Sequence, residues 1–462
     1  MSETAAPAEH EDATGSETGA DPADLPLAPG PDGLPVLGST LSLLRDPIEF
    51  LDVAAQHGDV VSYRIAGQRF TAVLHPDHVE QVLVRDHDRF RRWTGEEWGG
   101  VFADYAGDGL VLSEGEQWER QRRLLQRAFT PEQIEGYAAK MASEAAQVVA
   151  GWSDGQRLDL KAEMSSLTLR LLCRTLFDLD INERGAVVQR AATALNARAG
   201  SATAFLPAWL PTPTNRRLHS SMGDLEAMSD DLIAERRADA SERDDLLSLL
   251  LAAREDGDEM SEREIVDQLI TFLFAGHETT ALALTYALHT LGHHPERYRR
   301  LQREVESVTG GDPPTLADLP DLEYTEQVVQ ETLRLYPPAY AVFRESLEDV
   351  AVDGYRVPEG TKVSVPQIHV QRDARFFTDP DSFRPERWTD GFEDELPDYA
   401  YFPFGGGPRH CIGMRFAMME LKTVLPTVAA AVDLEPLTDE SVEFETGITL
   451  QPAERVETRV RI

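Results

Sequence analysis

Lysine is almost absent from this chain of 462 residues. Lys140, Lys161, Lys362 and Lys422 are the only lysines, and 44 basic residues face 81 acidic ones, so the formal net charge is −37. Such a field repels nucleic acid and anionic membranes, so we expect neither as a partner. It also destabilises the compact state unless salt screens the charges, which favours a protein from an extreme halophile. The alternative is an acidic protein from a bacterium with a GC-rich genome, in which arginine also displaces lysine.

Cysteine is scarce as well, with only Cys173 and Cys411. This is too few for a disulfide framework, and reduced thiols suit the cytoplasm, where we expect the protein to work. Cys173 lies in an apolar helical run and is predicted to be a small buried hydrophobe. No segment reaches the roughly 18 uninterrupted apolar residues of a membrane-spanning helix, and residues 1–24 have no apolar stretch. We therefore expect no membrane anchor and no signal peptide.

Two kinds of electron-carrier motif are also missing. The sequence has no glycine-rich fingerprint for a flavin or nicotinamide nucleotide, and no cysteine cluster for an iron–sulfur centre. Any electrons that the protein uses must therefore come from a separate carrier.

The distribution of sequence patterns predicts one domain. Residues 1–24 are acidic and rich in Ala and Glu, which predicts a disordered tail before a domain at 25–462. Residues 59–74 predict a β-hairpin around Gly67. Helical patterns dominate residues 113–343, and strand patterns return at residues 351–365 and at the C-terminal end. A helical body with small sheets near both ends indicates an α+β fold that is mostly α.

One predicted helix is unusually long. It begins with a capping box at Ser261 and Glu264 and ends at residues 292–295, Gly-His-His-Pro. Residues 269–291 are apolar nearly all round, so this part must be buried. Inside it, residues 275–280 have the sequence Ala-Gly-His-Glu-Thr-Thr. These residues conflict with helix propensity in an apolar setting, and such conflicts tend to mark function.

The segment from Phe402 to Gly413 is the second stretch whose composition indicates function. Three glycines and a proline predict a rigid loop, and residues 414–425 predict a helix directly after it. At a helix N-terminus, Cys411 meets free N–H groups that lower its pKa and favour the thiolate. Gly413 lets a flat cofactor approach the backbone, and Arg409 is a cation for an anionic group on it. The alternative for a lone cysteine is an inert buried thiol, but these surroundings indicate a ligand site.

These residues resemble the cytochrome P-450 superfamily. The loop matches the family's haem-binding pattern F-x-x-G-x-x-x-C-x-G, with the customary basic residue before the cysteine. The sequence also contains other motifs of the family, and all of them occur in the order that they have in the family. The resemblance extends from about residue 25 to the end of the sequence. The matching residues are Phe404, Gly407, Arg409, Cys411 and Gly413 in the loop; Trp118 and Arg122; residues 275–280; Glu331 and Arg334; and residues 383–388 with Arg387.

The resemblance implies the cytochrome P-450 fold and a bound haem b. Its iron would take the thiolate of Cys411, within a loop shaped by Phe404 and Gly413. The haem propionates would meet Trp118, Arg122 and Arg409, with Arg344 as a further ligand. The family also places Glu331, Arg334 and Arg387 in a buried charge network that supports the cysteine loop.

The resemblance further implies how oxygen is activated. Thr279 would hydrogen-bond the bound oxygen, and Glu278 would relay protons from solvent. The helix is expected to open at Ala275 and Gly276, which leaves room for dioxygen and a water. The alternative for Thr279 is a hydrogen bond back to the preceding turn, which is common for threonine in helices.

The implied reaction inserts one atom of dioxygen into a hydrophobic small-molecule substrate, with electrons from a separate ferredoxin or flavodoxin and its reductase. One rival is a peroxygenase of the same fold, which usually lacks the acid–threonine pair. The other is a haem-based sensor or carrier, against which the complete relay argues. Bulky hydrophobes are expected to line the pocket, although the same residues suit an ordinary core: Trp98, Val101, Phe102, Phe205, Leu206, Trp209, Phe272, residues 339–343 and Ile448.

A basic helix face predicts where an electron carrier docks. Arg120, Arg123 and Arg127 share the face opposite Trp118 and Arg122. We expect this face on the cysteine side of the haem, extended by Lys422 and open to an acidic carrier. The alternative is a solvated face whose arginines pair with surface acids.

Overall fold

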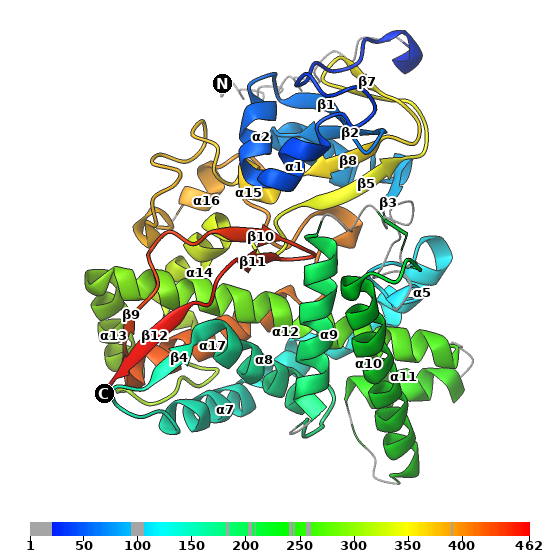
Figure 1. Cartoon of the computed structure of the whole chain (residues 1–462). Helices are drawn as coiled ribbons and strands as arrows, with labels where there is room; N and C mark the ends of the chain where they lie inside the picture. Colours follow the sequence, from blue (N-terminus) through cyan, green and yellow to red (C-terminus); the bar gives the residue numbers. More distant parts are fainter. Residues whose placement is uncertain are drawn as a thin grey trace, which may run out of the picture.

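The computed structural model describes residues 21–93, 106–181, 184–201, 206–207, 209–239, 243, 245–255, 260–389 and 391–462. Helices form most of the molecule, and small sheets lie at its margins, as predicted (Figure 1). The largest sheet lies with the N-terminal helices at one end of the molecule, and the long central helix crosses the helical body (Figure 1).

The helices have these bounds: α1 (Thr40–Arg45), α2 (Pro47–Ala55), α3 (Pro76–Glu80), α5 (Gly115–Leu125), α6 (Pro131–Glu135), α7 (Ala138–Ala150), α8 (Leu160–Leu176), α9 (Gly185–Ala199), α10 (Pro213–Ala238), α11 (Leu246–Glu255), α12 (Glu262–His293), α13 (Pro295–Thr309), α14 (Glu323–Leu335), α15 (Gln367–Val370), α16 (Phe392–Glu395) and α17 (Met414–Ala431).

The strands have these bounds: β1 (Val60–Ile65), β2 (Gln68–Val73), β3 (Phe90–Arg92), β4 (Arg157–Asp159), β5 (Val342–Ser346), β6 (Val350–Val352), β7 (Tyr355–Val357), β8 (Lys362–Val365), β9 (Asp433–Pro436), β10 (Phe444–Thr446), β11 (Leu450–Pro452) and β12 (Glu457–Arg461). The largest sheet has the order β1-β2-β8-β5-β3, in which only the β2–β8 pair is parallel.

Two hairpins reverse at residues with positive φ, and the one at Gly67 was predicted. The hairpin of β1 and β2 reverses at Ala66 and Gly67, which both adopt positive φ angles of 48° and 83°. The β6–β7 hairpin reverses at Asp353 and Gly354 in the same left-handed region. Glycine adopts this region without steric cost, which fixes where each strand ends.

The described part of the chain begins before residue 25, with residue 21. Pro22–Asp24 form a single 3₁₀ turn, and the Arg356 guanidinium donates to the Ala23 carbonyl at 3.1 Å. These residues belong to the segment predicted as a tail, and their contact with Arg356 ties them to the β7 region. Residues 1–20 lie outside the described part of the chain.

The long helix α12 forms with the predicted cap. The Ser261 hydroxyl accepts from the Glu264 N–H at 3.1 Å, and the Glu264 carboxylate accepts from the Ser261 N–H at 2.7 Å. The helix packs against α8, α14 and α17, which cover it on several sides. This burial explains why its apolar pattern has no polar face.

The helix after the cysteine loop is longer than predicted. It continues past Leu425 and through Pro426 to Ala431. Proline removes one backbone donor from a helix, but Val428 and Ala429 beyond it are fully buried in the main core. Burial of these residues offsets the lost hydrogen bond. Among the described residues, no helix combines the length and apolar composition needed to cross a bilayer.

Candidate active site

The loop that ends at Cys411 is held in one shape by its glycines. Gly405 and Gly407 have φ angles of 73° and 65°, in the left-handed region. A Cβ on Gly407 would lie 1.9 Å from the Leu83 carbonyl oxygen, so only glycine fits. The Cys411 N–H donates to the Phe404 carbonyl at 2.9 Å, which folds the loop back on itself. The sequence therefore places the thiol at a fixed point directly before α17.

The Cys411 side chain keeps accessible surface although protein atoms surround the sulfur. Burial raises the pKa of this thiol, whereas the Gly413 N–H and the Arg122 guanidinium act in the opposite direction. The N–H at the start of the helix therefore lowers the pKa of Cys411 as predicted, but burial outweighs it and the net shift is upward. A metal ion bonded to the sulfur supplies the positive charge that a buried thiolate requires.

Space beside Gly413 fits a flat cofactor. Its φ of −89° suits any residue, and a Cβ there would make only ordinary contacts with Phe129 at 3.8 Å and the Cys411 sulfur at 3.9 Å. Neither backbone conformation nor described neighbours therefore require glycine at this position. Close approach of a ligand to the backbone gives a reason for it, which agrees with the implied haem.

Three arginines converge with too little negative charge around them. Arg92 and Arg344 lie directly opposite each other in the antiparallel β3–β5 pair, where like charges are destabilising. Burial and the positive charges of Arg344 and Arg409 lower the pKa of Arg92 to about 9, and burial with Arg409 lowers that of Arg344 to about 10. Among the described residues, Glu114 is the acid that meets this group, through Arg409 at 2.8 Å.

The unbalanced charge of these arginines fits the propionates of haem. The Nε of Arg92 is buried and has no hydrogen-bond partner among the described residues. A buried guanidinium without an anion is costly, so an anionic ligand stabilises the group. Arg344 and Arg409 were predicted for this role, and Arg92 was not. No motif in the sequence indicated Arg92, because its role depends on its pairing with Arg344 across the sheet.

Trp118 and Arg122 point to different parts of the site. The Arg409 guanidinium lies 4.7 Å from the ring centroid of Trp118, so the indole supports the arginine cluster. Arg122 instead donates to the His410 carbonyl at 3.0 Å and lies beside the Cys411 thiol. The structure therefore brings Trp118 to the predicted cluster but places Arg122 on the cysteine loop. Helical spacing correctly placed Trp118 and Arg122 on one face of α5, but it could not show that they contact different residues.

One face of α12 is open where the rest of the helix is covered. Every residue from Glu264 to Leu291 is buried except Ala275, Gly276 and Thr279. These three lie within about one turn, so they form one small accessible patch in the middle of the helix. Thr279, Ala275 and Gly276 of the predicted catalytic residues are thus partly accessible, whereas Glu278 is buried.

The predicted opening of α12 is absent. The helix runs unbroken through this patch, and the Thr279 hydroxyl donates to the Ala275 carbonyl at 2.9 Å. This is the back-bonded alternative, which leaves the hydroxyl oxygen free to accept a second hydrogen bond. A Cβ on Gly276 would lie 2.7 Å from a methyl group of Leu172, so this glycine permits close packing of α8 against α12. The expectation that Gly276 opens the helix is wrong.

Glu278 points into the protein rather than towards solvent. It is buried, and its carboxylate accepts from the Gln451 amide of β11 at 2.8 Å. The buried His277 ring lies 3.5 Å from the other carboxylate oxygen, and burial lowers the pKa of that histidine. Glu278 therefore meets buried polar neighbours, Gln451 and His277, in place of bulk solvent.

The cysteine loop and the open face of α12 belong to one packed unit. Phe129 lies against Gly413 and stacks on Phe272 of α12, with ring centroids 5.7 Å apart. Glu420 of α17 lies beside the Thr280 hydroxyl of α12, and complete burial raises the pKa of this carboxyl well above its usual range. These contacts fix α17, which begins at the cysteine, against the helix that carries Thr279.

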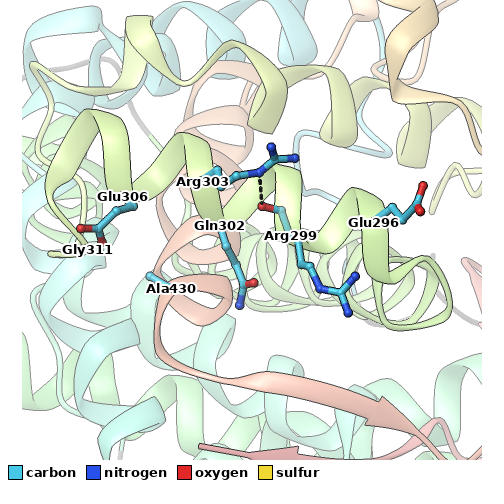
Figure 2. Close-up of a pocket in the computed structure, with 7 residues that line it drawn as sticks. All are labelled: Glu296, Arg299, Gln302, Arg303, Glu306, Gly311 and Ala430. Carbon is cyan, nitrogen blue, oxygen red and sulfur yellow. Dashed lines mark hydrogen bonds between the residues drawn. The ribbon is translucent and has the colours of Figure 1, made fainter.

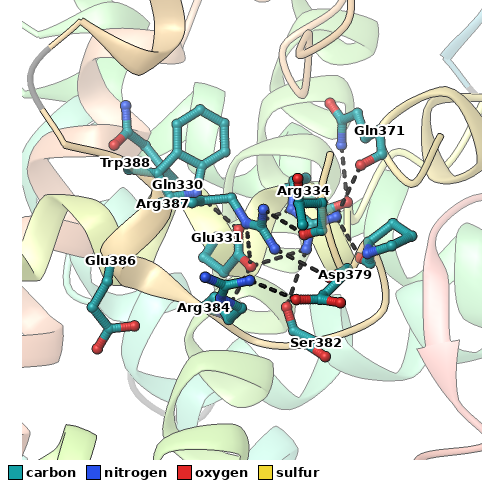
Figure 3. Close-up of polar contacts among 12 residues, drawn as sticks. Gln330, Glu331, Arg334, Gln371, Asp379, Ser382, Arg384, Glu386, Arg387 and Trp388 are labelled. Atoms are coloured by element: carbon teal, nitrogen blue, oxygen red, sulfur yellow. Dashed lines mark hydrogen bonds and ion pairs between the residues drawn. The ribbon is translucent and has the colours of Figure 1, made fainter. Parts of the chain in front are cut away.

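A buried charge network supports the loop as predicted (Figure 3). Arg334 donates to both oxygens of Glu331, at 2.8 and 2.9 Å, and Arg387 donates to one of them at 3.0 Å. The Trp388 indole and the Arg384 backbone N–H complete the shell, each at 2.8 Å. Burial raises the pKa of Glu331, but the arginines outweigh it and the net shift is downward. Removal of one partner leaves an uncompensated charge, which costs about 3–5 kcal/mol.

Gln371 joins this network to the cysteine loop, and sequence patterns did not indicate it. Its side-chain amide donates to the carbonyls of Leu333 and Arg334 at 3.0 and 3.2 Å. Its side-chain oxygen accepts from the Phe402 N–H at 2.9 Å, at the start of the loop. The Gln367 amide donates to the Phe402 carbonyl from the same helix–turn segment. Two buried glutamines therefore fix the point where the loop begins.

The hydrophobic residues expected around a substrate divide into groups. Phe272 is buried against Phe129, whereas Leu206, Trp209 and Ile448 are exposed. Cys173 is buried in α8, as predicted. Four of the pocket residues lie outside the described residues: Trp98, Val101, Phe102 and Phe205.

A surface hollow of about 660 Å³ lies between α13 and the end of α17 (Figure 2). Its walls are mostly charged or polar, and neither the cysteine loop nor α12 contributes to it. The hollow is therefore distinct from the candidate active site. Its lining residues are Glu296, Arg299, Gln302, Arg303, Glu306, Gly311 and Ala430.

The structure pairs some residues of the predicted docking patch with acids. Arg120 pairs with Glu264 of α12 at 2.5 Å, which is the alternative expected for this residue. Lys422 pairs with Glu326 of α14 at 2.7 Å and does not extend the patch. Arg123 and Arg127 are exposed on the segment that contacts the cysteine loop through Arg122 and Phe129.

Comparison with known proteins identifies the family of this chain. The family model for cytochrome P450 matches residues 28–458. Cyclooctat-9-en-7-ol 5-monooxygenase of Streptomyces melanosporofaciens is 36% identical over 90% of this chain and 92% of its own. Pentalenene oxygenase of Streptomyces avermitilis is 38% identical over 88% and 92%. The retinoic acid bound cyanobacterial CYP120A1 superposes with a TM-score of 0.83, at 26% identity, over 94% of this chain and 99% of that one. The chain therefore belongs to the cytochrome P450 family, the haem-thiolate monooxygenases.

Proposed function

We propose that this monooxygenase oxidises cyclic, largely apolar small molecules, with Glu278 and Thr279 in the delivery of protons. The observation that carries the proposal is the small accessible patch of Ala275, Gly276 and Thr279 in the otherwise buried α12. Two relatives named above act, by their names, on a cyclic alkenol and on pentalenene. The exposed apolar side chain of Ile448 offers a matching surface for such a substrate.

The haem, when bound through Cys411, supplies the iron at which dioxygen is activated. The chain's own residues then have separate tasks. Arg92, Arg344 and Arg409 balance the propionates, with Trp118 supporting Arg409. Arg122 fixes the His410 carbonyl beside the cysteine. At the open face of α12, the hydroxyl oxygen of Thr279 is free to accept a hydrogen bond. The neighbouring carboxyl of Glu278 supplies the protons that oxygen activation needs.

The substitution Thr279→Ala tests this assignment. We expect haem and substrate binding to persist while electrons are diverted to hydrogen peroxide, because proton delivery fails. The measurement is product formed per reductant consumed, with a fall of at least tenfold as the expected result. The matched control is Thr285→Ala, since Thr285 is buried on the same helix and also donates to the carbonyl one turn back, that of Ala281. Equal yields in both variants would remove Thr279 from the mechanism.

The substrate class has its own test. A panel of cyclic terpenes, fatty acids and steroids is titrated into the ferric protein, and displacement of the iron-bound water is followed in the absorption spectrum. We expect the cyclic terpenes to give the largest shifts at the lowest concentrations. Preferential binding of linear fatty acids would contradict the proposed substrate class.

Electrons reach the protein from a separate ferredoxin or flavodoxin with its reductase, in the cytoplasm. Two free cysteines and no disulfide between them suit a reducing compartment. We assign docking to a surface formed by Arg123 and Arg127, which follow Arg122, and by Arg415, four residues after Cys411; all three are exposed. On a chain with a net charge of −37, such a cluster is the complement of an acidic carrier.

A further inference from the structure

The carboxylate of Glu278 is held by a residue far from it in the sequence. Gln451 of β11 donates to it at 2.8 Å, and both side chains are buried, with 4% and 5% of their surfaces exposed. Among the described residues, neither lysine nor arginine forms an ion pair with Glu278. A buried carboxylate that pairs with neither lysine nor arginine depends strongly on each neutral donor that it has. The Gln451 amide is therefore a large part of what fixes this side chain.

Gln451 is itself fixed by a chain of hydrogen bonds that reaches α9. Its amide also donates to the Thr449 hydroxyl, and this hydroxyl donates to the Asn196 side-chain oxygen at 3.2 Å. The same oxygen accepts the backbone N–H groups of Ile448 and Thr449 at 3.1 and 3.2 Å. One buried asparagine on α9 thus binds three groups of the turn between β10 and β11.

This turn sits tightly on α9 and presents an apolar tip. A Cβ on Gly447 would lie 2.7 Å from the Asn196 side-chain oxygen, so the two segments touch. Ile448, the next residue, has 38% of its surface exposed although its N–H is bound to Asn196. The turn is also tied to α12 by the Tyr286 hydroxyl, which donates to the Leu450 carbonyl at 2.8 Å. A ligand that presses on Ile448 therefore acts on a segment joined to both α9 and α12.

We propose that Gln451 is a positioning residue for Glu278. The turn at residues 446–450, which is anchored by Asn196, fixes the position of Gln451. Substrate contact at Ile448 is therefore transmitted to Glu278, the proton-donating acid. The inference rests on the proposed role of Glu278. Loss of the Gln451 donor leaves the buried carboxylate without its strongest neutral partner, so its preferred rotamer changes. A misplaced acid transfers protons slowly even when its chemistry is intact.

The test compares Gln451→Met with a matched control. Methionine keeps the volume of glutamine and removes the donor. The control is Gln302→Met on α13, since Gln302 also donates to a carboxylate, that of Asp433 at 2.9 Å, beside the distant surface hollow (Figure 2). In Gln451→Met we expect product per reductant to fall about tenfold and the solvent isotope effect on product formation to rise. Gln302→Met should change neither.

A second readout does not depend on turnover. The infrared carboxyl band of Glu278, identified by its loss in Glu278→Gln, should shift in Gln451→Met and in Thr449→Val, which breaks the chain to Asn196. Thr449→Val keeps the proposal testable if Gln451→Met fails to fold. An unshifted band in the folded variants would overturn the proposal.

The outcomes separate this inference from the role of Glu278. If Glu278→Gln leaves product per reductant unchanged, the proposed relay fails, and the infrared result alone judges whether Gln451 positions the acid. If Glu278→Gln lowers the yield while Gln451→Met and Thr449→Val do not, Gln451 is not a positioning residue. If all three lower it and Gln302→Met does not, the proposal holds.

Discussion

The carboxyl of Asp267 ties the segment before α5 to the long helix. It accepts from the Asp108 N–H at 3.0 Å and pairs with Arg263 at 2.8 Å, while Gln268 beside it accepts from the Leu110 N–H at 3.0 Å. Burial raises the pKa of Asp267 to about 6, against 3.8 for an unperturbed aspartate, despite these donors. Ionisation of this carboxyl therefore lowers the free energy of unfolding.

The pKa of Asp267 predicts how stability depends on pH. Because the folded value lies above the unfolded one, the folded state binds the proton more tightly, and stability falls as the pH rises from about 4 to about 6. Above this range the cost is constant and at most about 3 kcal/mol. Asp267→Asn should therefore raise the melting temperature near pH 7 and leave it unchanged or lower near pH 4. Calorimetry at several pH values checks this; a lowered melting temperature near pH 7 would contradict it.

At the scale of helices and strands, sequence patterns correctly predicted the features formed by residues that are close along the chain. The capping box of α12, the β1–β2 turn at Gly67 and the pairing of Glu331 with Arg334 all join residues that are close along the chain. Side-chain periodicity placed Trp118 and Arg122 on one face of α5. It could not tell that Arg409 meets the first and His410 the second, because those partners lie almost 300 residues away.

The residues that sequence analysis missed have long-range partners. Gln371, Gln451 and Arg92 are ordinary polar residues in their local context, and their roles arise from Phe402, Glu278 and Arg344 respectively. Arg120 was misplaced for the same reason, since its partner Glu264 lies on another helix. The continuity of α12 at Gly276 was also missed, because packing of Leu172 against that glycine offsets its poor helix propensity.

The exposed arginines after the start of α5 predict the docking site of the electron carrier. Reversal of charge in Arg123→Glu with Arg127→Glu should slow reduction of the protein by its carrier about tenfold at low salt, because steering and contact are both lost. Substrate binding should not change. Stopped-flow reduction kinetics measure this effect.

A matched control uses two arginines on another exposed helix. Arg299→Glu with Arg303→Glu on α13 makes the same charge change beside the surface hollow of Figure 2. If this variant slows reduction as much as the α5 variant, the effect comes from net charge and the docking assignment is wrong.

At the scale of the whole molecule, the charge of −37 predicts a dependence on salt. Repulsion among exposed acids is screened within about 3 Å at molar ionic strength, whereas in dilute buffer it extends about 30 Å. We expect the melting temperature to rise by several degrees or more between dilute buffer and molar potassium chloride. Equal melting temperatures would contradict adaptation to a saline cytoplasm and would leave the enzyme's assignment intact.

The assigned chemistry depends on the position of one sulfur atom. Cys411 lies in a loop fixed by Gly407, Gln371 and the Glu331 network, and its exposed side chain lies beside Gly413. Cys173, by contrast, is buried in α8 within the main core.

The most direct test is the absorption spectrum of the reduced protein with carbon monoxide, recorded for Cys411→Ser and Cys173→Ser. Thiolate ligation gives a strongly red-shifted band. We predict that Cys173→Ser keeps this band and that Cys411→Ser loses it. Retention of the band in Cys411→Ser, or its loss in a folded, haem-loaded Cys173→Ser, would contradict the assignment of Cys411 as the iron ligand.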